Sequence, residues 1–531
     1  MKPTITIDRC PEGIYRGLNL PVTLISKLVV AALVVFAVAF PDQAVGVLGS
    51  LNAAMLSSFN AYYIYAVGLM LLFCLIVGFG PWGSIRLGAP EDRPEFSRFA
   101  WFSMMFGAGM GIGLLFYSIG EPLSHFQQNP ALIEEGIAPQ SAEAVLSSIR
   151  YTFLHWGLHG WAIYTTAGLA MAFFAYRMGL PLTIRSTLSP LFGDRLNGVL
   201  GHLIDIIAVV ATTLGIATTM GAGVSQLVSG VEFVTGIDSL VGPDGAPGAL
   251  PLMITLLVVM SLSTLSAVTG VKRGVNWLSQ FNMALSMVLL AVFVAFGATG
   301  FAFHLMGESL FDYLAALPEM SVEIWPVTSD LGQWQVDWTI LQRAWFIAFA
   351  PFVGLFLARI SRGRTLREFV LGCVVVPSLM CFVWILFLGG TSLQLEVSGV
   401  AGGQVIEAVN NNIASVLFVT IDFLNLWGLE TAIVIMSVLL IITYLVTSAD
   451  SGVLVLNTIM AGGDSEPAPR HRVIWGVLMT LVVGSLLLAG GLSAIQKAML
   501  IASLPFSALM LLMCVSMLKA LLGGQARHAP A

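Results

Sequence analysis

The feature that most constrains this chain is its succession of long apolar runs, several of which continue for about twenty residues with almost no charge. A helix that crosses the hydrocarbon core of a bilayer needs roughly 20 such residues. The runs are continuous rather than alternating, which argues against a membrane β-barrel. Charged residues make up 10% of the chain, whereas soluble domains carry about 25%. The sequence therefore predicts an all-α integral membrane protein.

Charge and cysteine usage argue against two further classes of site. The net charge is -6 and no basic stripe runs through the sequence, so no nucleic-acid partner is expected. The five cysteines show no metal-ligand spacing, and four of them lie within apolar runs. Neither a disulfide framework nor a cysteine metal site is indicated.

Twelve transmembrane helices are predicted from the apolar runs. If both termini are cytoplasmic, all but four of the 23 lysines and arginines fall in cytoplasmic segments, as the positive-inside rule requires. We therefore expect a multi-pass protein of a bacterial cytoplasmic (inner) membrane with both termini inside. The expected spans are approximately residues 19–40, 57–80, 99–121, 150–176, 201–234, 249–270, 275–304, 340–360, 368–390, 430–460, 471–491 and 495–520.

The spans divide into two peripheral helices and two sets of five. Because five is an odd number, the two sets must cross the membrane in opposite senses. The expected segments are a short cytoplasmic N-terminus (1–18), two peripheral helices (19–97), a first five-helix repeat (98–304), an outer surface helix and loop (305–339), a second five-helix repeat (340–520) and a short cytoplasmic tail (521–531).

Each set of five opens with a helix that carries breaking residues. The first contains four alternating glycines within 107–113, and each glycine costs a helix interior about 1 kcal/mol relative to alanine. The second contains Pro351 and Gly354. Taken singly, such residues more often serve close helix packing. Interruptions at corresponding positions of inverted halves are typical of the binding site of a secondary transporter.

Aromatic side chains gather on one side of the fourth span. Trp156, Trp161 and Tyr164 fall within an arc of about 140° at 100° per residue. Membrane tryptophans usually mark the interfaces, but Tyr164 lies well inside this span. Aromatic faces at that depth suit a quaternary ammonium, through cation–π attraction of up to about 2 kcal/mol. The eighth span adds Trp345, Phe346 and Phe349.

Two histidines of the fourth span, His155 and His159, stand four residues apart. That spacing can hold a metal, but the glutamate of a zincin motif is missing. Buried, hydrogen-bonded histidines are the expected interpretation.

Four segments together resemble a known family. They are Gly109–Phe116, Trp156–Tyr164, Pro351–Thr365 and Thr447–Ser451. In these motifs and their order, the chain resembles the betaine/choline/carnitine transporter family (BCCT) over about residues 15–520. The resemblance implies a five-plus-five inverted repeat, like the core of the neurotransmitter:sodium symporters, preceded by two extra helices. It also implies a homotrimer, alternating access, and solutes such as glycine betaine, carnitine, choline or dimethylsulfoniopropionate.

The resemblance also implies two sets of binding residues. Hydroxyl and unwound carbonyl oxygens are hard ligands that suit Na⁺, which is the coupling ion of the family, and no further cofactor is expected. The sodium ligands would be Gly107, Met110, Tyr444, Thr447 and Ser448. The substrate-binding residues would be Trp156, Trp161, Tyr164, Trp345, Phe346, Phe349, Met110 and Gly111.

Departures from the family pattern bear on ion coupling. Many members have tryptophan at Phe346 and Phe349, so the ring face is kept while the indole N–H is lost. Of two hydroxyl positions associated with a second sodium, Thr212 is present, but Ile216 carries no oxygen. A second sodium site is therefore not expected. No basic residue stands near Asn282, where sodium-independent relatives supply an arginine, and this favours sodium coupling.

Arg343 is unusual because it stands in the eighth span, three residues before Phe346. An arginine in a span costs roughly 2.5–3.5 kcal/mol on insertion scales. Two interpretations stay open. The side chain snorkels or pairs with a loop near the outer interface, or it gates the site and contacts the carboxylate or sulfonate of the substrate.

The sequence therefore predicts a sodium-coupled symporter that imports a small quaternary-ammonium or sulfonium zwitterion. One alternative keeps the fold but carries choline, carnitine or taurine, with sodium-independent exchange as a variant. A membrane-embedded enzyme would need clustered acids, histidines or a nucleophile, and the candidates are sparse. The basic loop Arg359–Arg367 is expected to meet anionic lipids.

Overall fold

The computed structural model describes residues 5–109, 111–243, 245–269, 272–464 and 469–524. For residues 106–109, 267–269, 272–276 and 469 it describes the backbone alone. Every regular element in these ranges is a helix, apart from two isolated β-bridges. Nine helices of the described chain are long and apolar enough to cross a membrane. The prediction of an all-α membrane protein is thereby confirmed.

Most predicted spans coincide with one long helix each. α2 begins well before its expected limit, α11 ends before its limit, and α16 is the last part of a helical stretch, Leu366–Val397, that contains the predicted span 368–390. α20 covers the last two predicted spans and is kinked at Gly490 and Gly491, where the prediction placed their boundary. The long helices are α1 (Leu20–Ala39), α2 (Pro41–Phe79), α9 (Val199–Thr235), α10 (Ala249–Thr269), α11 (Lys272–Phe296), α14 (Leu341–Arg359), α16 (Val376–Val397), α19 (Glu430–Met460) and α20 (Pro469–Leu522).

The third and fourth predicted spans are each broken into two shorter helices. α3 (Arg98–Gly109) and α4 (Ile112–Gln127) are separated in the glycine run, as expected. The break between α6 (Ala144–Trp156) and α7 (Leu158–Ala172) was not expected. It falls at Gly157, where a Cβ would lie 2.6 Å from the Phe382 ring. Only glycine fits at this close approach.

The expected break in the eighth span is wrong. α14 continues as an α-helix through Pro351 and Gly354. A Cβ on Gly354 would lie 2.8 Å from Ala167 Cβ and 2.9 Å from the Gly168 nitrogen on α7. This glycine therefore lets two helices pack closely, which is the common role of small residues in membrane proteins.

α12 (Thr299–Met320) covers the first part of the segment predicted as a surface helix and loop (305–339), although it begins before residue 305. The seventh predicted span ends correspondingly early, at Phe296. Arg150 on α6 fixes α12 in place, because its Nε and Nη2 donate to the two Asp312 carboxylate oxygens at 2.6 and 2.7 Å. Such bidentate pairs are among the stronger charge-assisted contacts.

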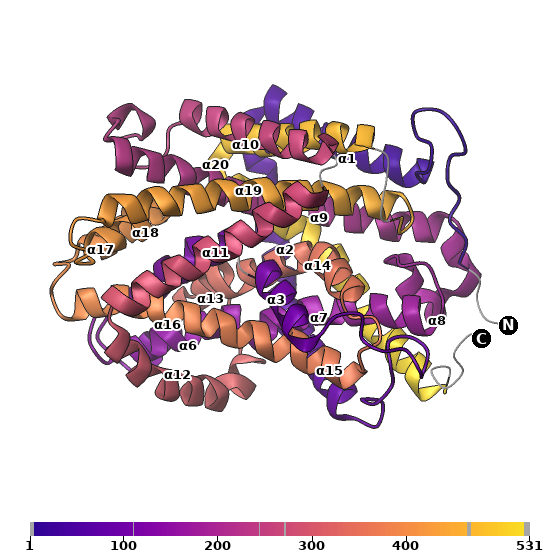
Figure 1. Cartoon of the computed structure of the whole chain (residues 1–531), viewed down its shortest axis with the longest axis horizontal. Helices are drawn as coiled ribbons and strands as arrows, with labels where there is room; N and C mark the ends of the chain where they lie inside the picture. The colour runs from indigo at the N-terminus through magenta and orange to yellow at the C-terminus, as the bar shows by residue number, and fades with distance from the viewer. Residues whose placement is uncertain (1–4, 110, 244, 270–271, 465–468, 525–531) are drawn as a thin grey trace.

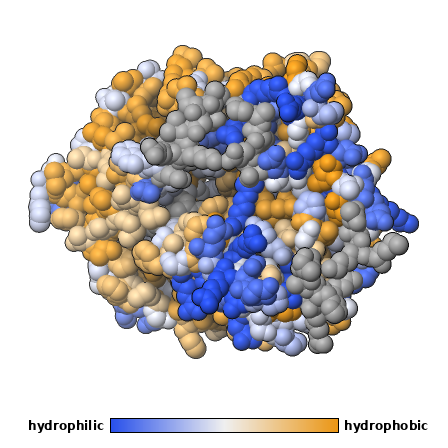
Figure 2. Space-filling view, turned by 45° about the vertical axis from the view of Figure 1, so that its right-hand side comes forward, coloured by the Kyte–Doolittle hydropathy of each residue, from blue (hydrophilic) through white to orange (hydrophobic). Residues whose placement is uncertain are grey.

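Several of the long helices, among them α10 and α19, run roughly along the horizontal axis of Figure 1, and both ends of the described chain lie at its right-hand end. α8 (Ser189–Phe192) and α15 (Leu366–Val370) lie toward the same end. When this end is turned forward, hydrophilic residues gather in a band on it, while hydrophobic residues dominate the left of the view (Figure 2). This distribution suits a protein whose sides face lipid and whose ends face water.

The basic segment Arg359–Arg367, from the end of α14 to the start of α15, is held largely by protein contacts. The Arg364 guanidinium lies 4.5 Å from the centre of the Trp101 ring and donates to the Phe96 carbonyl. Arg367 donates from Nε to the Gly78 carbonyl at 3.0 Å. Arg364 is buried, whereas Arg362 and Arg367 are exposed, and Arg362 Nε lies 3.7 Å from Asp92 Oδ2.

Candidate functional site

The predicted aromatic residues of α6, α7 and α14 meet in one buried cluster. The Trp156 ring lies 6.4 Å from the Trp345 ring and 5.9 Å from the Phe346 ring, both nearly edge-on. Tyr164 stacks on Phe346 with ring centres 4.8 Å apart and planes 12° apart. Trp161 contacts Tyr164 edge-on at 5.5 Å. We call these five residues the aromatic cluster.

α4 begins directly beneath the indoles of this cluster. A Cβ on Gly113 would lie 2.8 Å from Trp345 Cη2 and 3.1 Å from Trp156 Cη2. Gly111 is the N-cap of α4 in an extended conformation. The free N–H groups and the positive dipole end of this half-helix therefore lie next to the aromatic cluster. The neighbouring Met110 lies outside the described residues.

The aromatic cluster differs from the prediction in two members. Phe349 makes its ring contact with Phe352, at 5.0 Å, and packs near Gly215 of α9. Tyr117 of α4 was not predicted, yet its ring lies 6.2 Å from Trp156 and 6.0 Å from Trp345. Tyr117 could have been identified from the sequence by its position one helical turn after Gly113.

The Tyr164 and Phe346 rings are stacked directly on each other. A cation held between these two aromatic faces would have to separate them. The structure thus describes the aromatic cluster in a closed arrangement, in which all five members are at least nine-tenths buried.

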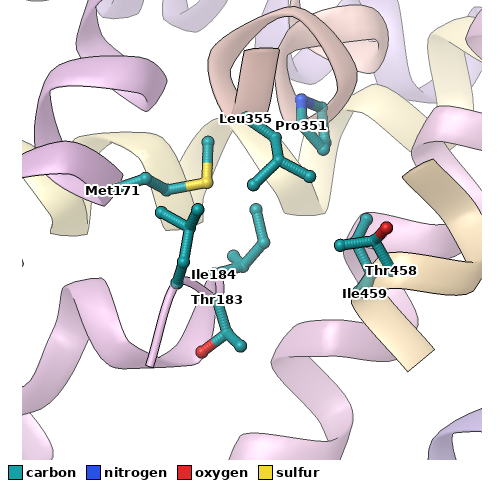
Figure 3. A pocket seen from close by; sticks show the side chains of 8 residues that line it. Met171, Thr183, Ile184, Pro351, Leu355, Thr458 and Ile459 are labelled. Carbon is teal, nitrogen blue, oxygen red and sulfur yellow. The ribbon is translucent and has the colours of Figure 1, made fainter. Parts of the chain in front are cut away.

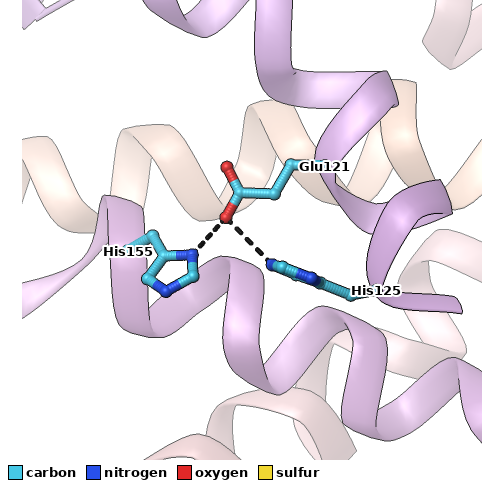
Figure 4. A group of neighbouring side chains, drawn as sticks. All are labelled: Glu121, His125 and His155. Atoms are coloured by element: carbon cyan, nitrogen blue, oxygen red, sulfur yellow. Dashed lines mark hydrogen bonds and ion pairs between the residues drawn. The ribbon is translucent and has the colours of Figure 1, made fainter. Parts of the chain in front are cut away.

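A buried carboxylate organises the polar side of the aromatic cluster. Glu121 Oε2 accepts a hydrogen bond from Trp156 Nε1 at 2.7 Å. Its other oxygen, Oε1, lies 2.5 Å from His155 Nδ1 and 3.3 Å from His125 Nε2. Figure 4 shows the two imidazoles converging on this oxygen. Glu121 thereby fixes the orientation of one indole of the aromatic cluster.

The histidines of the fourth span are buried and hydrogen-bonded, as the sequence indicated. His155 Nε2 lies 2.9 Å from Thr339 Oγ1, and His159 Nε2 lies 2.9 Å from Ser321 Oγ. The two do not share a ligand. His155 instead meets Glu121 and His125 of α4, an arrangement that the spacing of residues 155 and 159 does not reveal. An acid inside an apolar run was the available signal for Glu121.

Arg343 is enclosed by protein, because its side chain is 2% exposed. Nη1 donates to the Ile64 carbonyl of α2 at 3.2 Å, while Nη2 has no hydrogen-bond partner among the described residues. Snorkelling to the interface is therefore wrong. A buried guanidinium with a free donor is costly unless a partner arrives.

The predicted sodium ligands are placed in part. On α19, the Tyr444 hydroxyl lies 2.9 Å from Ser286 Oγ, and Thr447 Oγ1 accepts from Asn282 Nδ2 at 3.1 Å. Asn282 Oδ1 is buried and has no hydrogen-bond partner among the described residues. Ser448 follows on the same helix, partly buried. Gly107 lies in α3, but its surroundings, like Met110, lie outside what the structure describes.

A small cavity lies further along the two helices that carry most of the aromatic cluster. Met171 stands about two turns beyond Tyr164 on α7, and Leu355 stands beyond Phe346 on α14. The side chains around this cavity are mostly apolar (Figure 3). The lining residues are Met171, Leu182, Thr183, Ile184, Pro351, Leu355, Thr458 and Ile459.

The chain matches known transporters over nearly its whole length. A family model described as "BCCT, betaine/carnitine/choline family transporter" matches residues 21–526. The glycine betaine transporter OpuD of Bacillus subtilis is 37% identical over 494 residues, which are 93% of this chain and 92% of that protein. A probable glycine betaine transporter of Desulfitobacterium hafniense is 36% identical over 504 residues, covering 94% and 97%. The osmo-independent choline transporter BetT1 of Acinetobacter baylyi is 34% identical over 487 residues, covering 91% and 90%.

Proposed function

Because the chain belongs to the betaine/carnitine/choline transporter family, we propose that it is a sodium-coupled symporter of a small quaternary-ammonium or sulfonium zwitterion. Glycine betaine and dimethylsulfoniopropionate are the solutes of the expected type. We propose twelve crossings, with the two five-helix sets forming an inverted repeat. Family membership makes the chain a multi-pass membrane transporter rather than an enzyme.

The observation that carries the proposed substrate class is the aromatic cluster above the start of α4. Its rings offer π faces to a methylated cation, which has no hydrogen-bond donor of its own. The N-terminal end of α4 offers free N–H groups and a positive dipole to the carboxylate of the same zwitterion. A cation site and an anion site thus stand side by side, as a zwitterion requires.

The proposed ion site uses oxygens of α19. On α19, the Tyr444 hydroxyl lies beside Ser286 Oγ and Thr447 Oγ1 lies beside the Asn282 amide, whose Oδ1 on α11 has no hydrogen-bond partner among the described residues. Oxygen donors of this kind suit Na⁺. The carbonyls of Gly107 and Met110 would complete the site from the broken third span, as in other transporters with discontinuous helices.

Transport would proceed by alternating access around the aromatic cluster. Its closed rings would part to admit the solute, and the apolar cavity beside Met171 and Leu355 would form part of the path to the cytoplasm. We further propose a homotrimer in the bacterial inner membrane with both termini inside. Contact with anionic lipids would fall mainly to Arg362 and Arg367, which are exposed, since Arg364 is buried within the protein.

Calorimetry on the purified protein tests the proposal. Glycine betaine, dimethylsulfoniopropionate, carnitine, choline and taurine are titrated with and without Na⁺. We expect binding of a methylated zwitterion that requires Na⁺. Binding that ignores Na⁺ would replace symport by sodium-independent exchange. Binding of taurine alone would show that the aromatic cluster does not select the substrate.

A second titration tests whether Arg343 contacts the substrate carboxylate through its unpartnered Nη2. A hydrogen bond to a charged group contributes about 1.5–3 kcal/mol, so Arg343→Ala should weaken zwitterion binding by about tenfold or more. Choline has no carboxylate, and its binding should change little. Arg343→Lys, which keeps the charge, should lose less. Equal losses for both solutes, or none, would remove Arg343 from the substrate site.

A further inference from the structure

Three metal-ligating side chains converge beside the aromatic cluster, and solute binding does not account for all of them. Glu121, His125 and His155 are each at most 2% exposed. One ligand atom from each lies within 4.8 Å of the others. We propose that these three residues form a binding site for a divalent transition metal, with Zn²⁺ as its best-suited occupant.

The donor set selects the class of metal. Two imidazoles and one carboxylate form a ligand set that holds Zn²⁺ with a fourth position left open. Imidazole nitrogen also favours zinc over magnesium or calcium, which prefer oxygen ligands. The proposed sodium ligands, by contrast, are all oxygens. The two ion sites therefore differ in chemistry as well as in the residues that form them.

The two separations between Glu121 and the imidazoles need only a small adjustment to accept the ion, while the ligand atoms of the two histidines lie within 4.8 Å of each other and would approach on binding. Metal–ligand distances of about 2.0–2.1 Å at tetrahedral angles place ligand atoms roughly 3.3 Å apart. His125 Nε2 is already 3.3 Å from Glu121 Oε1. His155 Nδ1, at 2.5 Å, would have to move outward by less than an ångström.

The surrounding hydrogen bonds support a metal-bound His155. A ligating histidine usually uses its second nitrogen to bond a neighbouring group, which fixes the ring and its tautomer. His155 Nε2 has such a partner in Thr339 Oγ1, at 2.9 Å. The tautomer that binds the metal through Nδ1 carries its proton on Nε2, where the Thr339 hydroxyl can accept it.

The charges near the metal site determine its expected affinity for Zn²⁺. The Glu121 carboxylate attracts a cation in a region from which water is excluded. The Arg343 guanidinium interacts electrostatically with His155, and its positive charge opposes a second cation. The site should therefore bind Zn²⁺ more weakly than a structural zinc site does. Because all three ligands are buried, binding should also be slow.

Occupation of the metal site would act on the aromatic cluster through Glu121. The carboxylate that would bind the metal through Oε1 holds the Trp156 indole through Oε2. Movement of this carboxylate toward a metal would alter the position of Trp156. Zn²⁺ is therefore expected to weaken solute binding, and by linkage the solute should weaken Zn²⁺ binding by the same factor.

The test is a Zn²⁺ titration of the full-length purified protein against a chromophoric chelator, read after equilibration. The main variant is His125→Phe, which removes one ligand but keeps a ring among Tyr151, Trp334 and Trp338. The matched control is His304→Gln. His304 lies on α12, 73% exposed and 3.8 Å from Glu308, and could bind surface zinc.

We expect wild-type protein and His304→Gln to bind one buried Zn²⁺, and His125→Phe to bind it at least about tenfold more weakly. Co²⁺ in place of Zn²⁺ should give the intense visible absorption of a four-coordinate site, which His125→Phe should lose. A titration unchanged by His125→Phe but abolished by His304→Gln would overturn the proposal.

Discussion

Replacing Glu121 by alanine is expected to cause the largest loss of stability of any single change near the aromatic cluster. Leaving a buried hydrogen-bonding group without its partner costs about 1–3 kcal/mol for each group. The change leaves Trp156 Nε1 and the two facing imidazoles without their shared acceptor. Thermal unfolding of the detergent-solubilised protein measures the effect. A clear fall in Tm is expected.

Two further variants show whether this loss comes from the hydrogen-bond network. Glu121→Gln keeps the volume and one acceptor oxygen, so it should recover part of the stability. Glu308→Ala removes an acid from the exposed face of α12 and should change stability by no more than about 0.5 kcal/mol. If Glu121→Ala unfolds at the same temperature as the wild type, Glu121 does not hold the network together.

The helical architecture could be predicted from the sequence because few backbone structures are stable in lipid. The backbone N–H and C=O groups of a span must be hydrogen-bonded to one another, and its side chains must be mostly apolar over its length. Both requirements can be assessed from the order of the residues. The end of α19 and the kink between Gly490 and Gly491 were accordingly predicted closely. Local composition could not distinguish a glycine that breaks a helix from one that lets helices pack. Gly157 and Gly354 were misjudged for that reason, since their roles depend on Phe382 and on α7.

The candidate site was predictable in its aromatic part and not in its polar part. Trp156, Trp161 and Tyr164 share one helix or its continuation, so their common side follows from helical geometry. Glu121, His155 and Thr339 come from different elements. Their convergence depends on how α4, α6 and the segment before α14 pack, and residue spacing does not encode that. The sequence indicated that an arginine in a span is energetically costly, but it did not indicate that Arg343 would donate to the Ile64 carbonyl.

Replacing Trp156 by alanine is expected to cause the largest loss of solute affinity. A desolvated cation–π contact contributes up to about 2 kcal/mol, which corresponds to roughly 30-fold in the dissociation constant. Trp156 also packs against Trp345, Phe346 and Tyr117, so its removal should loosen the facing rings and add to the loss. Calorimetry with glycine betaine in saturating Na⁺ measures the effect.

Two matched variants separate the contributions of the Trp156 ring. Trp156→Phe keeps an aromatic face but removes the N–H that donates to Glu121, so it should fall between the wild type and Trp156→Ala. Trp277→Ala removes a tryptophan that is 69% exposed on α11 and should leave binding unchanged. An equal loss in the phenylalanine and alanine variants would assign the effect to the hydrogen bond rather than to the π face. Unchanged affinity in Trp156→Ala would exclude the aromatic cluster as the cation site. Trp156 contacts the Trp345 and Phe346 rings and donates to Glu121, so its loss should affect any cation bound among these rings.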